Sequence, residues 1–183
     1  MAKLGIFLAN GCEECEALTV VDLVRRAGLT IDMISIYEEE EVTSSHKVIF
    51  RTDTTIASAD LDSYDGIILP GGMPGTLNLG ANPDVVRTIK RFASEKKLVA
   101  AVCAAPTVLG ENGLLEGRKA TCYPGMEDKL TGARFVTDPV AVDGSIITSR
   151  GLGTTIPFAA AIIAHFLGQE KADAVLSQIV YNL

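Results

Sequence analysis

The sequence has no tryptophan, and only two histidines and four cysteines occur among its 183 residues. Four cysteines are too few for a small fold that depends on disulfides, so we expect free thiols in a reducing compartment, the cytoplasm. Because His46 and His165 are the only histidines, we expect no metal site. No apolar run reaches the roughly 20 residues that cross a bilayer, and the run at 4–9 is shorter than the roughly 7–15 residues of a signal-peptide core.

Positive charge is also scarce. The chain carries 16 basic and 23 acidic residues, which gives a formal net charge of −7 at pH 7. A negative field of this kind repels phosphate backbones and anionic lipid surfaces. We therefore expect neither nucleic acid nor a membrane to be a general partner.

What is present is a regular alternation of strand-like and helical patterns. With 48% hydrophobic residues and the length of one domain, residues 1–183 are expected to form a single core. Strands are predicted at 3–9, 30–37, 66–69 and 98–102, with shorter strands or hairpin pieces within 43–55, 118–122, 135–136 and 145–149. Helices are predicted at 14–27, from Pro106 onward, at 154–166 and at 171–181. The alternation predicts an α/β sandwich with a mostly parallel sheet and helices on both faces, because parallel strands need crossover connections.

Cys103 follows directly on the apolar run at 98–102, and Ala104, Ala105 and Pro106 come after it. A sharp turn from strand to helix requires small residues, and proline is tolerated in the first helical turn. This pattern predicts a nucleophile elbow at Cys103, with the positive end of the helix favouring the thiolate. The alternative is a small buried side chain at the end of a strand.

A glycine turn, Pro70-Gly71-Gly72, follows the strand at 66–69. In a parallel sheet, ligands collect beyond the carboxyl ends of the strands. Glycine lets backbone amides approach a ligand closely, so the N–H groups of Gly72 and Ala104 are candidates for holding an oxyanion. Pro-Gly-Gly is also compatible with an ordinary turn.

Three glutamates, Glu13, Glu14 and Glu16, follow the first strand at the start of a predicted helix. Carboxylates in a first helical turn match the helix dipole, which is a structural reason for at least two of them. A third that turned into the cleft at the sheet edge would lie near Cys103.

Cys12 and Cys15 have the C-x-x-C spacing of redox dithiols. The carboxylates around them should raise the pKa of both thiols, which argues against a reactive dithiol. A zinc site there would need Cys122 and a histidine from elsewhere in the chain.

Together these turns resemble the ThiJ/PfpI family, in the branch that includes the parkinsonism-associated protein deglycase. The resemblance covers nearly the whole chain and implies a flavodoxin-like fold of the class I glutamine amidotransferase-like type. It also implies a homodimer. The matching segments are Glu-Glu-Cys-Glu at 13–16 with Val21-Asp22 and Arg25-Arg26-Ala27-Gly28, Leu69-Pro70-Gly71-Gly72, 101–106, Thr148-Ser149-Arg150-Gly151 and Gly153-Thr154.

The resemblance also implies roles for particular residues. Cys103 is the reactive cysteine, and Glu16 is a protonated carboxyl that donates a hydrogen bond to its thiolate. The amides of Gly72 and Ala104 form an oxyanion pocket. Arg26 matches an arginine of the family's anion-lined dimer cleft. Burial favours the neutral form of a carboxyl, which agrees with the role implied for Glu16.

The chain departs from the family pattern at two positions. Tyr123 stands where many members have a histidine, and tyrosine is a poor base at neutral pH. A Cys-His dyad for hydrolysis therefore lacks its base. His46 stands where the deglycase branch has an arginine, so we expect a weaker anion site there, with an exposed loop histidine as the alternative.

The resemblance implies a cysteine-dependent enzyme that needs no cofactor and acts on reactive dicarbonyls such as methylglyoxal, or on early glycation adducts. An alternative is an oxidative-stress sensor or protective chaperone in which Cys103 is oxidised to a sulfinic acid. Cys122 is a candidate resolving thiol in that case. A role in thiamine-thiazole metabolism and a cysteine hydrolase are the weaker alternatives.

Overall fold

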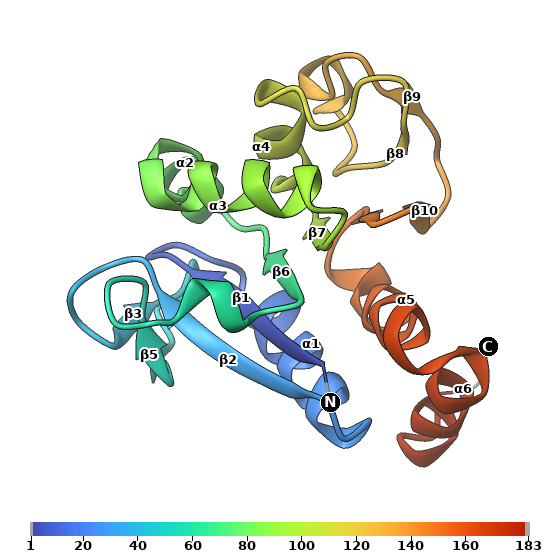
Figure 1. Cartoon of the computed structure of the whole chain (residues 1–183), viewed down its shortest axis with the longest axis horizontal. Helices are drawn as coiled ribbons and strands as arrows, with labels where there is room; N and C mark the ends of the chain where they lie inside the picture. The colour runs from blue at the N-terminus through green and yellow to red at the C-terminus, as the bar shows by residue number, and fades with distance from the viewer. Residues whose placement is uncertain (1, 182–183) are drawn as a thin grey trace.

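The computed structural model describes residues 2–181 (Figure 1). Its strands are β1 (Lys3–Leu8), β2 (Thr30–Ser35), β3 (Glu41–Thr43), β4 (Ile49–Arg51), β5 (Thr54–Thr55), β6 (Gly66–Leu69), β7 (Leu98–Val102), β8 (Lys119–Ala120), β9 (Arg134–Phe135), β10 (Val140–Asp143) and β11 (Ile146–Ser149). Its helices are α1 (Glu14–Arg26), α2 (Gly75–Ala81), α3 (Pro83–Ser94), α4 (Pro106–Glu111), α5 (Thr155–Leu167) and α6 (Gln169–Gln178).

The central sheet has the strand order β10-β11-β7-β6-β1-β2-β5. β10 runs antiparallel to β11, and every other neighbouring pair is parallel. This confirms the predicted mostly parallel sheet. The strands predicted at 66–69 and 98–102 coincide with β6 and β7, because strands buried on both faces appear in the sequence as uninterrupted apolar runs.

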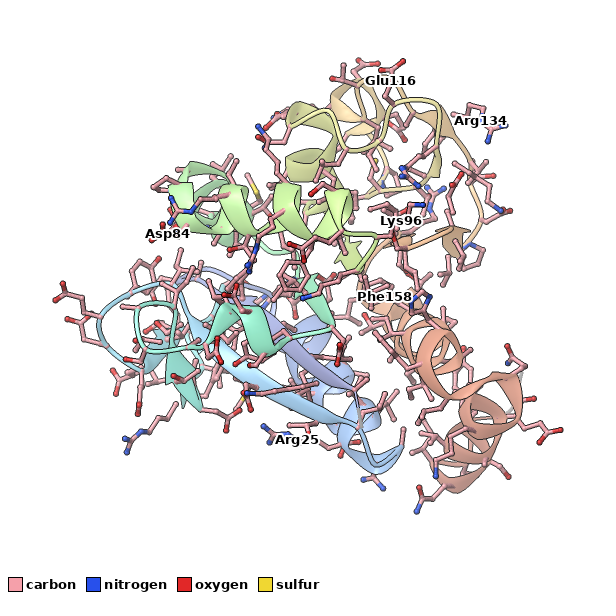
Figure 2. The ribbon with its side chains drawn as sticks, in the orientation of Figure 1. Arg25, Asp84, Lys96, Glu116, Arg134 and Phe158 are labelled. Carbon is pink, nitrogen blue, oxygen red and sulfur yellow. The ribbon has the colours of Figure 1, made fainter. Side chains whose placement is uncertain are left out.

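Helices cover both faces of the sheet, with α1, α5 and α6 on one side and α2, α3 and α4 on the other (Figure 1). Alternate residues of β1 enter opposite cores, because side chains alternate along a strand: Ile6 packs on the α1 side and Phe7 on the α3 side. Phe158 of α5 lies against the sheet, whereas the charged Glu116 and Arg134 lie at the periphery (Figure 2). None of the helices among residues 2–181 is long and apolar enough to span a bilayer.

Three elements were not predicted from the sequence: α2, α3 and β10. α3 carries a clear start signal, because the Asn82 side chain accepts hydrogen bonds from the N–H groups of Asp84 and Val85, with Pro83 in the first turn. Its apolar residues, including Ile89 and Phe92, are buried against the sheet. The last helix begins and ends earlier than the predicted 171–181.

The chain order around β1 places three turns at one edge of the sheet. β2 lies on one side of β1 and β6 on the other, so the order reverses between β1 and β6. The turns after β1, β6 and β7 therefore meet at the carboxyl edge. Backbone hydrogen bonds join the first two, from Glu13 N–H to Gly71 C=O at 2.9 Å and from Gly75 N–H to Gly11 C=O at 3.1 Å.

Candidate active site

Cys103 occupies the predicted sharp turn between β7 and α4. Its φ is +65°, in the left-handed region that a non-glycine residue rarely adopts. The surrounding backbone holds it there: Cys103 N–H donates to the Ser149 carbonyl at 3.0 Å, and Cys103 C=O accepts from Tyr123 N–H at 2.8 Å. Strained conformations that neighbours fix in this way are typical of functional positions.

Glu16 is the glutamate that faces the cleft. It lies in the first turn of α1 and is only 1% exposed. One carboxylate oxygen, Oε2, accepts from Gly71 N–H at 2.9 Å, and the carboxyl group also shares a hydrogen bond with the Cys103 thiol. Glu13 instead caps α1 by accepting from Cys15 N–H. The structure thus brings Cys103 and Glu16 together, and the catalytic roles implied for them stay predictions.

Burial raises the pKa of Glu16 to about 7, although its hydrogen bonds with Cys103 and Gly71 act in the opposite direction. Desolvation penalises a charged carboxylate. A substantial fraction of Glu16 is therefore protonated near neutral pH and able to donate a hydrogen bond.

Burial, together with the negative charge of Glu16, raises the pKa of the Cys103 thiol to about 12, even though the N–H groups of Ala104 and Gly72 act to lower it. The amides thus act in the predicted direction, towards the thiolate, but while Glu16 is ionised they do not offset burial beside a carboxylate. Protonation of Glu16 removes that charge and supplies a donor. The two groups titrate together, so the protonation state of Glu16 affects the pKa of the Cys103 thiol.

A cavity of about 370 Å³ opens beside Cys103. The predicted residues Gly72, Ala104 and Tyr123 line it together with the cysteine. Its other walls are Met73, Pro124 and Met126, for which no sequence pattern predicted a place in the site. The N–H groups of Gly72 and Ala104 are near enough to the sulfur to lower the pKa of its thiol.

Arg26 does not line this cavity. It lies in the last turn of α1, where its Nε is 2.7 Å from Asp22 Oδ2, and it borders a separate groove along α1. Its anion-binding role between subunits stays a prediction. His46 has its Nδ1 at 3.1 Å from Glu14 Oε1 and 3.3 Å from Glu13 Oε2. The two carboxylates leave it poorly suited to bind an anion.

The C-x-x-C pair does not form a disulfide: Cys12 is buried, Cys15 is exposed, and both thiols are free. Burial, with the neighbouring glutamate charges adding to it, raises the pKa of both thiols. The expected direction of these shifts is confirmed. Cys122 is a buried free thiol, and burial raises its pKa to about 11, so its role as a resolving thiol stays a prediction.

The geometry of these turns agrees with a family assignment made from the sequence. The model of the DJ-1/PfpI family matches residues 2–165. The chain belongs to this family.

Individual DJ-1/PfpI relatives extend over most of the chain. Protein DJ-1 homolog B of Arabidopsis thaliana is 39% identical over 165 residues, which cover 90% of this chain and 38% of the plant protein. The chain therefore spans about two fifths of the plant protein's length. The glutathione-independent glyoxalase DJR-1.2 of Caenorhabditis elegans is 31% identical over 169 residues, 91% of this chain and 89% of its own. The structure of oxidized Toxoplasma gondii DJ-1 matches with a TM-score of 0.96 at 33% identity and covers both chains completely. The flavodoxin-like fold of the DJ-1/PfpI family is thereby confirmed.

Gly71 is the glycine of this DJ-1/PfpI site at which an added side chain would meet both Cys103 and Glu16. A side chain there would place its Cβ 2.5 Å from Cys103 Cβ and 2.6 Å from Glu16 Oε2. We expect Gly71→Ala to displace both side chains and to lower about 10²-fold the kcat/KM of any reaction that depends on Cys103 and Glu16, the size of effect that a displacement of about 1 Å produces. Steady-state kinetics measures the change. The matched control is Gly80→Ala, because a Cβ at Gly80 would lie 3.5 Å from Val108, an ordinary van der Waals distance. An equal loss of kcat/KM in both variants would contradict the prediction.

The raised pKa of Glu16 predicts that ionising this residue destabilises the fold. Between about pH 4.5 and 7 the folded chain keeps a proton that the unfolded chain has released, so this group's contribution to stability falls as pH rises through that window. At about 1.4 kcal/mol per pKa unit, the loss is on the order of 3 kcal/mol. We expect Glu16→Gln to unfold at higher urea concentration than wild type at pH 8.

The comparison with pH 4.5 makes this prediction specific. The glutamine of this variant keeps an oxygen that can accept from Gly71 N–H but carries no charge, so the difference between the variant and wild type should shrink to near zero at pH 4.5. A stability difference that is the same at both pH values would contradict the assigned cause. Urea titrations followed by circular dichroism give both values.

Proposed function

We propose that this chain converts small α-dicarbonyls such as methylglyoxal into hydroxy acids, with Cys103 as nucleophile and Glu16 as proton carrier. The observation that carries the proposal is the buried carboxyl of Glu16, hydrogen-bonded to a cysteine in an elbow beside an open cavity. A carboxyl with a pKa near the working pH is suited to both giving and taking a proton. The relative named as a glutathione-independent glyoxalase supports the same chemistry.

In the first step, the Cys103 thiolate attacks the aldehyde carbon of methylglyoxal and forms an S–C bond. The aldehyde oxygen takes the proton of Glu16, which gives a hemithioacetal. The N–H groups of Gly72 and Ala104 lie at the sulfur, where they can stabilise the developing oxyanion.

In the second step, the Glu16 carboxylate removes the hydrogen of the former aldehyde carbon as a proton and returns it to the former ketone carbon. The hydroxyl proton moves from the first oxygen to the second, which leaves a thioester. The aldehyde carbon is thus oxidised by two electrons that the ketone carbon takes up. This internal balance needs no redox cofactor.

Water then cleaves the thioester. Its oxygen joins the acyl carbon, the sulfur leaves as thiolate, one proton returns to Glu16 and the other goes to solvent. Lactate is released, and the site is restored. The same attack on the adduct of a dicarbonyl with an amine or thiol would be a deglycase activity.

We also propose that the chain acts in the cytoplasm, where free thiols persist, and as a homodimer. The groove along α1 supports the dimer, because apolar side chains such as Leu18, Ile156 and Ile179 border it and Leu18 is 37% exposed. Sedimentation of the purified chain tests the dimer.

The test of the activity is lactate formation from methylglyoxal by the purified chain without glutathione. The comparison sample is the same chain after stoichiometric alkylation with iodoacetamide, mapped to Cys103 by peptide mass. Lactate from the untreated sample and none from the alkylated sample is the expected result. Absence of lactate from the untreated chain overturns the proposal.

Redox sensing is the second candidate. Cys103 is partly exposed, and the carboxyl of Glu16 and the N–H of Gly72 are placed to hold oxygens on its sulfur. The matched Toxoplasma gondii DJ-1 structure is of an oxidized protein. Mild peroxide followed by intact mass tests this candidate: a gain of two oxygens at Cys103, with no lactate from methylglyoxal, would favour sensing over catalysis. With Tyr123 in place of histidine, a cysteine hydrolase has no evident base.

A further inference from the structure

We propose that the preferred dicarbonyl carries an aromatic or branched aliphatic group beside the aldehyde, rather than a methyl group. This inference deepens the proposed function and rests on it. It comes from the walls of the cavity next to Cys103, which are made by Met73, Ala104, Tyr123, Pro124 and Met126 together with Gly72. Among the described residues that line this cavity, none carries a charge.

Two of these walls are large apolar groups exposed to solvent. Met73 is 48% exposed and Tyr123 is 51% exposed. Exposed apolar surface gathered around a reactive group gains free energy when a ligand covers it. A polar or charged substituent would gain less from these walls, because only the Tyr123 hydroxyl could form a hydrogen bond with it. The cavity therefore selects for an apolar group on the substrate.

The size of the cavity exceeds what methylglyoxal needs. A volume of about 370 Å³ lies in the range of roughly 300–1,000 Å³ typical of pockets for drug-sized ligands. Met73 and Met126 also border a second cavity of about 80 Å³. Methionine side chains adapt readily, and this space on their other side gives them room to move. A ring or a branched chain can be accommodated without displacing the backbone.

The aromatic wall is held in a fixed position relative to the sulfur. Tyr123 N–H donates to the Cys103 carbonyl at 2.8 Å, and Met126 N–H donates to the Tyr123 carbonyl at 3.2 Å. A Cβ placed on Gly151 would lie 3.6 Å from Tyr123 Cδ2 and 4.0 Å from Cys103 Sγ. The edge of the tyrosine ring and the sulfur thus both lie within 4.0 Å of the same point beside Gly151. A planar group bonded through Cys103 falls within reach of that ring, where offset or edge-to-face packing is favourable.

The experiment compares two alkylating agents with the same reactive carbon, iodoacetamide and N-phenyl iodoacetamide. Each forms an S–C bond with Cys103 and releases iodide, and peptide mass confirms the site. Every rate constant is divided by the rate constant for glutathione with the same reagent, which removes intrinsic reactivity. We expect the phenyl reagent to be favoured by about tenfold or more, as partial burial of one ring predicts. Phenylglyoxal should exceed methylglyoxal in kcat/KM by a similar factor.

Variants locate the preference in the cavity. Tyr123→Ser and Met126→Ser should each lower the normalised ratio toward one. Leu167→Ser is the matched control, because Leu167 is 41% exposed at the end of α5 and does not line the cavity. It should keep the wild-type ratio, and circular dichroism confirms folding of each variant. A loss of the ratio in Leu167→Ser equal to that in Tyr123→Ser would overturn the assignment to the cavity.

The outcomes separate this inference from the proposed function. A normalised ratio near one for the wild-type chain overturns the inference, even if methylglyoxal yields lactate. A high ratio with no hydroxy acid from either dicarbonyl supports the apolar site and overturns the proposed activity instead. Because the wild-type ratio alone decides the first point, the test holds even if Met126→Ser does not fold.

Discussion

Cys103→Ala is expected to lower lactate formation from methylglyoxal by about 10⁴-fold or more, to the limit of detection. The hemithioacetal forms on the sulfur, so no later step can occur on this path without it. Alanine fits the elbow, although φ of +65° remains unfavourable for any residue with a Cβ, so the variant should fold with stability close to that of wild type. Enzymatic assay of lactate after long incubation gives the measurement.

Two of the other three cysteines provide matched controls. Cys15→Ala changes an exposed thiol and Cys122→Ala a buried one, and neither residue contacts the Cys103–Glu16 pair through a hydrogen bond among the described residues. Both variants should retain lactate formation. If Cys103→Ala retained it as well, the nucleophile would have to lie elsewhere, and the mechanism proposed for this site would be wrong.

Much of the fold follows from local patterns. The sequence predicts β6 and β7 with their observed ends. Both strands are buried on both faces, so each is a continuous apolar run whose limits are clear in the sequence. The turn at Cys103 was predicted from the small residues after a buried strand. α3 is not among the predicted helices, although the sequence contains the signals for it. Asn82-Pro83 is an ordinary helix start, and the apolar residues that follow have helical spacing.

The site itself required information that local patterns do not contain. The helix dipole alone does not distinguish the three glutamates at the start of α1. Glu16 is distinguished only because the turn after β6 comes close to it, where Gly71 N–H donates a hydrogen bond to its carboxylate. The direction of the Cys103 pKa shift depends on burial and on the charge of Glu16, both of which arise from packing. Met73 and Met126 meet at the cavity because of how two loops far apart in sequence are folded. Nothing in their immediate sequence indicates this.

Glu16→Gln is expected to lower kcat for methylglyoxal by about 10²–10⁴-fold, the usual contribution of a general acid–base group. The glutamine amide can donate a hydrogen bond to the Cys103 thiolate and can accept one from Gly71 N–H, so the geometry is preserved. It cannot take up and return a proton between the two carbons of the substrate. Addition of the thiolate to the aldehyde should therefore continue, with water in place of Glu16 as the proton source, while conversion of the hemithioacetal to the thioester stops.

Two measurements on this variant separate proton transfer from thiol reactivity. Alkylation of Cys103 by iodoacetamide should persist, whereas lactate formation should fall steeply. Glu14→Gln is the control, because Glu14 lies in the same helical turn but faces His46 rather than Cys103. If alkylation and turnover fell by the same factor in Glu16→Gln, the carboxyl would act only by setting the ionisation of the thiol. The shift of a proton between carbons would then have to depend on another group or on water, although the coupling between Glu16 and Cys103 would still stand.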